Sequence, residues 1–211
     1  MAPKNKYTRE EMVEAAVRVV RKKGIDALTA KALAGELGVS TQPVFTCFHT
    51  IEEAKHEVRT AAERIYDRYV EEGLHMTIPF LGVGMQYIRF AKEEPQLYRL
   101  LFLTMGEDGS SSAMSALHHS QELVRESLQQ TYHIDAETAD RYYRDMWLVV
   151  HSLATLWVTG GCPYSEEETE QILAGFSVSI CKSIKEIPGF AKNQYDRDEI
   201  FRGLVENSKK R

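Results

Sequence analysis

Apolar residues recur along most of this chain at the three- and four-residue spacing of amphipathic helices, while the alternating pattern of strands is almost absent. The first such segment carries Met12, Ala15, Ala16, Val19 and Val20 on one helical face. This patterning predicts an all-α protein.

Start and stop signals divide the pattern into about ten helices. The start signals are the capping boxes Thr8–Glu11, Thr50–Glu53 and Ser165–Glu168, the N-cap Asp135 and the first-turn prolines Pro79 and Pro95. We expect helices at about 8–23, 30–37, 41–47, 51–74, 78–93, 95–104, 112–132, 136–159, 166–186 and 197–206, with a flexible loop at 106–112.

The segment from Leu28 to Phe48 predicts two short helices joined by a tight turn. Two helices that cross at roughly 90–120° need a small residue at their closest approach, and Ala34 provides it. Gly38 tolerates the positive φ of the turn, and Val44 supplies an apolar residue that faces the first helix. The segment is therefore interpreted as a helix-turn-helix whose second helix can enter a DNA major groove.

These elements predict two domains. Residues 1–54 would form a three-helix DNA-binding head, and residues 55–211 a larger helical body.

The distribution of charge agrees with a DNA contact at one end of the molecule. The 211 residues carry a formal net charge of −5, which excludes a chain that is basic throughout. Residues 1–50 nevertheless hold eight Lys or Arg against five Asp or Glu. A mildly basic head on an acidic body fits DNA binding by the head, although many enzymes are as uneven.

Cysteine usage and the chain ends indicate a reduced cytoplasmic protein. Cys47, Cys162 and Cys181 are an odd number without metal-like spacing, and their redox role is left open. The polar N-terminus does not have the pattern of a signal peptide. The longest apolar run, 146–158, is shorter than the roughly 20 residues that span a bilayer.

The stretch GIDALTAKALAGELGVSTQPVFTCFHTIEEA closely resembles the N-terminal domain of the tetracycline-repressor (TetR) family of bacterial transcription regulators. The resemblance implies that Thr29 and Lys31 touch the phosphate backbone of operator DNA and that His49 lies near it. It places the remaining DNA-binding candidates on the recognition helix, namely Thr41, Gln42, Phe45 and Thr46. In addition, Gln42 has the amide that pairs with adenine N6 and N7.

Two positions depart from the family pattern. Phe45 replaces a usual tyrosine and lacks the hydroxyl that bonds a phosphate, and Ile51 replaces a frequent lysine. Fewer phosphate contacts lower the expected non-specific affinity and its salt dependence. The basic cluster Arg18, Arg21, Lys22 and Lys23 could either be a solvated face that complements the helix dipole or contact DNA directly.

The last helices of the body carry a candidate dimer interface. The segment 141–161 is apolar nearly all round, so it is expected to be buried on more than one side. The next helix has a stripe of Ile172, Phe176, Ile180 and Ile184, which could be an intrachain core or an association seam. The resemblance favours the seam, because these regulators dimerise through a four-helix bundle of their last two major helices.

The pattern Trp147-x-x-x-His151-Ser152 resembles that of a family branch with a Trp-His-Gly motif, with Ser152 in place of the glycine. The resemblance also implies a small-molecule effector inside the body. The candidate lining residues are Met85, Tyr87, Phe90, Tyr98, Phe102, Met105, Trp147, His151 and Leu156. Each aromatic or Met is also compatible with plain core. The composition favours a largely apolar or aromatic effector with one polar anchor.

Enzyme signatures are missing from the sequence. It contains no Gly-rich phosphate loop, HExxH motif or nucleophile elbow. His119 and Glu122 have helical spacing but no second pair of possible metal ligands. We therefore expect no catalytic residue, metal or cofactor. The expected function is a homodimeric regulator, most often a repressor, which binds palindromic operator DNA and is released by an effector. The alternative is a helical binding or adaptor protein that has lost operator binding.

Overall fold

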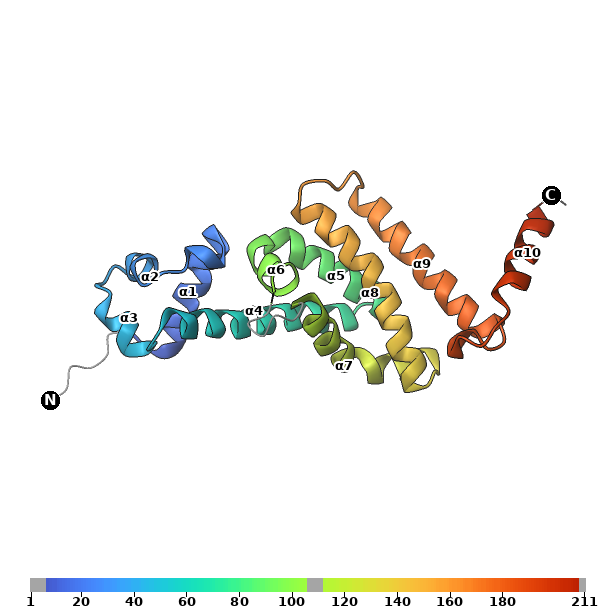
Figure 1. The fold of residues 1–211 in the computed structure, drawn as a ribbon, viewed down its shortest axis with the longest axis horizontal. Helices are drawn as coiled ribbons and strands as arrows, with labels where there is room; N and C mark the ends of the chain where they lie inside the picture. The colour runs from blue at the N-terminus through green and yellow to red at the C-terminus, as the bar shows by residue number, and fades with distance from the viewer. Residues whose placement is uncertain (1–6, 106–111, 209–211) are drawn as a thin grey trace.

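The computed structural model describes residues 7–105 and 112–208, and those ranges contain ten α-helices and no strand. The helices are α1 Arg9–Lys23, α2 Ala30–Leu37, α3 Gln42–Cys47, α4 Ile51–Leu74, α5 Pro79–Glu93, α6 Pro95–Phe102, α7 Ser112–Tyr132, α8 Ala136–Val158, α9 Glu166–Glu186 and α10 Arg197–Ser208. Figure 1 shows α1 to α3 as a head at one end, with α4 leading from it into the body.

The expected all-α architecture is confirmed, and each expected helix has a counterpart that ends within two residues of its prediction. Two short 3₁₀ helices, Ile25–Ala27 and Phe190–Lys192, were not expected. Of the expected loop at 106–112, residues 106–111 lie outside the described ranges, and Ser112 begins α7.

Helix caps follow the sequence signals with one exception. Reciprocal capping boxes form at Thr8 with Glu11 and at Ser165 with Glu168, and Asp135 caps α8. The predicted box at Thr50 is only half formed. The Thr50 side chain accepts a bond from the Glu53 amide, but the Glu53 carboxylate accepts one from the amide of His49.

The turn between α2 and α3 has the predicted conformation. Gly38 adopts φ 64° and ψ 38°, in the left-handed region, and ends α2. Leu33, Val44 and Phe48 are fully buried, so the turn directs one face of α3 into a core shared with α1 and α4.

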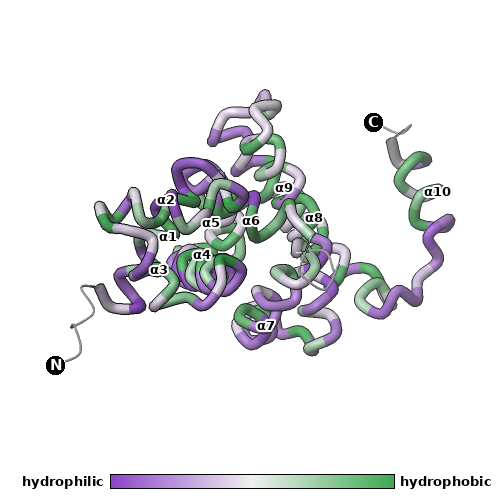
Figure 2. The backbone as a smooth tube through the Cα atoms, turned by 60° about the vertical axis from the view of Figure 1, so that its left-hand side comes forward, coloured by the Kyte–Doolittle hydropathy of each residue, from purple (hydrophilic) through white to green (hydrophobic). Residues whose placement is uncertain are grey.

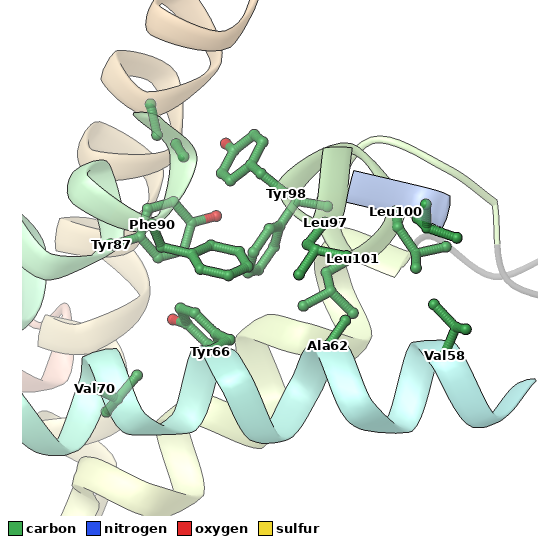
Figure 3. Packing of buried hydrophobic residues seen from close by; sticks show 14 of the residues in the cluster. Val58, Ala62, Tyr66, Val70, Tyr87, Phe90, Leu97, Tyr98, Leu100 and Leu101 are labelled. Carbon is green, nitrogen blue, oxygen red and sulfur yellow. The ribbon is translucent and has the colours of Figure 1, made fainter. Parts of the chain in front are cut away.

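Helix α4 belongs to the cores of both the head and the body. Its buried residues recur every four positions, at Ala54, Val58, Ala62, Tyr66 and Val70. At 1.5 Å per residue, this 24-residue helix is about 36 Å long. Figure 3 shows Val58, Ala62 and Tyr66 pointing toward residues of α5 and α6.

The body packs around α5, which contacts α4, α8 and α9. The helices α4 and α5 touch backbone to backbone, because a Cβ on Gly73 would lie 2.6 Å from Val83 Cα. Beyond α9, the helix α10 stands apart from the body and carries exposed apolar residues such as Phe201 and Leu204 (Figures 1 and 2).

Replacing Gly38 by alanine should lower the free energy of unfolding by about 1 kcal/mol, because a Cβ is strained at positive φ. Gly35→Ala is the matched control, since Gly35 lies within helix α2 and a Cβ added there would meet no atom within 4 Å. It should stabilise the protein by roughly 0.5–1 kcal/mol through helix propensity. Urea unfolding measures both changes, and equal effects of the two substitutions would contradict the assigned turn.

Candidate functional site

All seven residues predicted to contact DNA are exposed on one end of the head. They come from the start of α2, from the start and outer face of α3, and from the residue after Phe48. They are Thr29, Lys31, Thr41, Gln42, Phe45, Thr46 and His49. Phe45 is 52% exposed, whereas Val44 and Phe48 are completely buried, as expected for core residues. Helix α3 therefore has one structural face and one face available to a ligand.

The start of α2 combines a helix N-terminus with a capping hydroxyl and an exposed lysine. The Thr29 hydroxyl oxygen caps the helix by accepting a bond from the Ala32 amide at 3.1 Å, which leaves its proton available to a further acceptor. Lys31 is exposed beside it, and both residues line a surface hollow with Lys22 and Lys23. Free amides and cations at a helix N-terminus suit a phosphate group.

The exposed side chains of α3 differ in whether they already form hydrogen bonds within the chain. The Thr46 hydroxyl donates to the carbonyl of Gln42 at 3.0 Å, so it is held against its own helix. In the described part of the chain, the side-chain amide of Gln42 has no hydrogen-bond partner. It can therefore turn to a base edge without breaking an internal bond.

Arg9 connects three helices of the head and its exit, a role that the sequence did not reveal. Its guanidinium bonds the carboxylates of Glu53 and Glu57 and the carbonyl of Cys47, and so ties α1 to α3 and α4. Arg9 is the main reason that the pKa of Glu53 falls to about 2, with a further contribution from His49. His49 contacts the same carboxylate through its amide and its ring Nδ1, at 2.8 and 3.1 Å.

The basic cluster at the end of α1 is largely engaged in internal ion pairs. Arg18 and Lys22 contact Glu36 of α2 at 3.1 and 2.7 Å. Arg21 makes a two-point contact with Glu94 at the corner between α5 and α6, at 2.8 and 2.5 Å. These pairs favour a structural role for three of the four basic residues.

His151 lies within an aromatic cluster at the junction of α5, α6 and α8. Its ring stacks on Trp147 with centroids 4.5 Å apart and planes inclined by 8°. The hydroxyls of Tyr87 and Tyr98 approach its Nδ1 at 3.0 and 3.1 Å, and the Tyr98 hydroxyl also contacts Thr155. Burial lowers the pKa of His151 below its ordinary value. His151 therefore has polar partners within an otherwise apolar segment.

A small apolar cavity adjoins this cluster. It has a volume of about 30 Å³ and lies between α5, α8 and α9, where Tyr87, Trp147 and Leu173 are among its walls. That volume holds about one or two water molecules. Among residues 7–105 and 112–208, the buried Nε1 of Trp147 has no hydrogen-bond partner.

A larger groove lies along the same three helices, with a volume of about 280 Å³. Met85 lines it together with Gln86, Lys92 and Trp157, and Lys92 stands over the Trp157 ring at 4.4 Å. The Gln86 Oε1 and the Trp157 Nε1 are both buried and have no hydrogen-bond partner in the part of the chain that the structure describes. No motif in the sequence pointed to Gln86, Lys92 or Trp157, because they come together only through the packing of three helices.

The other candidate effector residues line neither of these two cavities. Phe90 and Phe102 are buried beside Tyr66, as Figure 3 shows for Phe90, and Tyr98 is buried against Phe102. Leu156 is 39% exposed and Met105 is 67% exposed, so neither lies in the interior where it was expected. The roles of all these residues as effector contacts stay predictions.

One face of α8 is uncovered in the single chain. Leu148, Ser152 and Leu156 follow one another at four-residue spacing, and all three are exposed. The neighbouring helix α9 exposes Phe176, while Ile172, Ile180 and Ile184 are half-buried. The expected seam is therefore partly packed against the body and partly open.

Metal binding and membrane insertion find no support in the described residues. No three His, Cys, Asp or Glu side chains come together there in a metal-binding group, and His119 instead contacts Asp67 at 2.9 Å. No helix in those ranges combines the length and apolar character needed to cross a membrane.

Comparisons with known proteins agree with this architecture. Residues 80–175 match the family model described as the tetracyclin repressor-like C-terminal domain. No curated protein matches the sequence. A tetR-family transcriptional regulator from Streptomyces coelicolor shares the fold with a TM-score of 0.67 and 14% identity, over 95% of this chain and 96% of that one.

Two further solved structures share the fold. A protein of unknown function from Rhodococcus sp. RHA1 has a TM-score of 0.67 and 19% identity, and covers 87% of this chain and 98% of its own. The multidrug binding protein EbrR, complexed with imidazole, has a TM-score of 0.56 and 19% identity, and covers 80% and 93%. Residues 80–175 are therefore similar to the C-terminal domain of tetracycline-repressor-like proteins, and the chain shares its fold from head to body with a regulator of that family.

Proposed function

We propose that this regulator binds a palindromic operator as a homodimer and is released, most simply as a repressor, by a small molecule bound in its body. The observation that carries the proposal is the two-sided helix α3, with Val44 buried and Gln42 and Phe45 exposed. A helix held from behind by a rigid core can present its outer side chains to base edges in a major groove.

The division of labour among the exposed residues follows from their chemistry. Thr29 and Lys31 would hold phosphates at the start of α2, and His49 would approach the backbone beyond α3. Gln42 would read adenine through paired hydrogen bonds, and Thr41, Phe45 and Thr46 would contact base edges or thymine methyl groups.

Dimerisation would supply the second head that a palindromic site requires. The exposed apolar face of α8 and the exposed Phe176 of α9 support an interface there, because water otherwise covers this apolar surface. Two heads bound on one face of DNA reach half-sites about 34–36 Å apart, or a multiple of that distance. We place the division between head and body at residues 54 and 55, within α4.

The effector would bind along the seam of α5, α8 and α9, which holds the small cavity and the larger groove. The Trp147 Nε1, the Trp157 Nε1 and the Gln86 Oε1, which have no partner within the described ranges, support a largely apolar ligand with a few polar groups. The resting cavity beside Trp147 is too small for such a ligand, so binding there would require the aromatic cluster to move.

A chain of direct contacts leads from this cluster to the head. His151 contacts Tyr98 of α6, and the corner before α6 carries Glu94, which holds Arg21 of α1. A ligand that displaces His151 would move α6 and thereby change the position of the head. Release requires that the ligand bind the altered state more tightly than the DNA-bound state.

An adaptor protein that has lost operator binding is the alternative function. It predicts no saturable, sequence-dependent binding to the DNA upstream of the coding region or to a selected DNA library. The regulator predicts such binding, with an affinity that falls as salt rises.

Gln42→Ala and Lys31→Ala should affect DNA binding in different ways. Losing the Gln42 amide should reduce discrimination at one base position by about 1–3 kcal/mol. Losing the Lys31 charge should weaken binding to all DNA sequences similarly. It should also reduce the slope of log affinity against log salt concentration by about 1. Titrations of a site library at several salt concentrations measure both, with Lys182→Ala on α9 as the control. A base-specific loss at Lys31 would refute its phosphate role.

Phe176→Asp should produce monomers and abolish tight operator binding, because a carboxylate would be buried in the interface. Leu123→Asp is the matched control, since Leu123 is a similarly exposed apolar residue on α7. Sedimentation velocity measures the oligomeric state of both variants. A stable dimer in the Phe176 variant would place the interface elsewhere.

The lowered pKa of His151 should make stability depend on pH. The unfolded chain takes up this proton near the ordinary pKa of about 6.5, while the folded protein resists it. The contribution of neutral His151 to the free energy of unfolding is therefore present above about pH 6.5 and is lost as the pH falls below it. Between pH 7.5 and 5.5, wild type should lose more unfolding free energy than His151→Gln, with exposed His56→Gln as control. Parallel curves for wild type and His151→Gln would contradict this assignment.

A further inference from the structure

Four arginines converge on one open groove between the head and the helix that leaves it. The groove has a volume of about 550 Å³. Arg18 and Arg21 line it from α1, and Arg64 and Arg68 line it from α4. Glu14 is the single acidic residue among the described walls, while Arg18 and Arg21 are paired with Glu36 and Glu94 beyond them, so the uncompensated positive charge of the groove comes from Arg64 and Arg68.

Two of these arginines form no contact that stabilises the fold in the described residues. Arg64 and Arg68 are exposed and have no ion pair or hydrogen bond in the described parts of the chain. They lie four residues apart, so they point from the same face of α4. By contrast, Arg18 contacts Glu36 through its Nε alone, and Arg21 is held by Glu94.

The floor of the groove is apolar. Val13 and Val17 of α1 and Ala61 and Ile65 of α4 line it beneath the charged residues. A bound molecule could therefore place a ring or aliphatic portion on this floor and an anionic group against the guanidinium groups. The planar fork of arginine matches the oxygens of a phosphate group better than a lysine ammonium does.

We propose that this groove is a binding site for a phosphorylated small molecule that carries a ring or aliphatic portion, with Arg64 and Arg68 as its main ligands. The volume is within the range of small-molecule sites, roughly 300–1,000 Å³. The site is separate from the effector seam proposed between α5, α8 and α9, and its existence does not depend on that seam or on operator binding.

The phosphates of a bound operator do not account for this groove. Helix α4 begins at Ile51, next to the recognition helix, and leads away from it toward the body (Figure 1). Arg64 and Arg68 are 13 and 17 residues beyond that start. At 1.5 Å per residue, they lie about 20 and 26 Å from it along the helix axis.

The position of the groove gives an occupant a route to regulation. Arg21 borders the groove and also holds Glu94 at the start of α6. A phosphate in the groove would compete with the Glu94 carboxylate for Arg21. Binding would therefore be linked to the contact between the head and α6.

The test measures binding to the full chain by isothermal titration calorimetry, without DNA. The probes are ADP and pyrophosphate, with adenosine as the uncharged ring and sulfate as the simple anion. ADP should bind more tightly than pyrophosphate, since it also covers the apolar floor, and adenosine should not bind measurably. The double variant Arg64→Gln/Arg68→Gln should weaken ADP binding about 10-fold or more, since two charge-assisted contacts are lost.

Arg197→Gln/Arg202→Gln on α10 is the matched control, because it removes the same charge from exposed arginines far from the groove. It should leave ADP binding unchanged. Equal losses in both double variants would reveal general electrostatic attraction and overturn the site, as would the absence of ADP and pyrophosphate binding to wild type. Loss of operator affinity in the Arg64/Arg68 variant without any ADP binding would make the groove a DNA contact instead, and would also overturn the proposal.

Discussion

The fold depends on one helix that belongs to two cores. The buried stripe of α4 starts at Ala54 and Val58 against the head and continues through Tyr66 and Val70 into the body. A single helix without an internal break transmits orientation over its whole length, because bending it would break backbone hydrogen bonds. The position of the head therefore follows from how α4 packs on α5 and α6.

A second set of contacts joins the head to the interior of the body. Arg21 joins the end of α1 to Glu94, and Tyr98, one turn further along α6, contacts His151. The ion pair is partly solvated, with side chains 41% and 13% exposed, so it is weaker than a buried pair and can exchange partners. A packed helix and an exchangeable ion pair together connect the head to the aromatic cluster, a combination that suits a protein with two positions of its head.

Much of the fold could be predicted from the sequence, because its signals are local. Capping residues, first-turn prolines and apolar periodicity located the helices to within two residues, since each signal acts within one turn of its own helix. The positive φ of Gly38 followed in the same way from a tight turn. The box at Thr50 is only half formed because the Glu53 carboxylate is shared between His49 and Arg9, and Arg9 is 44 residues away in sequence.

In the candidate site, too, local features could be predicted from the sequence and features that depend on tertiary packing could not. By itself, the sequence determined the all-α fold, the helix-turn-helix and the exposed residues of α3, since these follow from spacing along a single segment. Only the tertiary structure decided which side chains share a cavity, that His151 meets Tyr87 and Tyr98, and that four arginines of α1 and α4 line one groove. It also turned Leu156 and Met105 outward. The physical reason is that cavities and ion pairs depend on how helices distant in sequence are rotated and packed, and periodicity within one helix does not specify the neighbour that its faces meet.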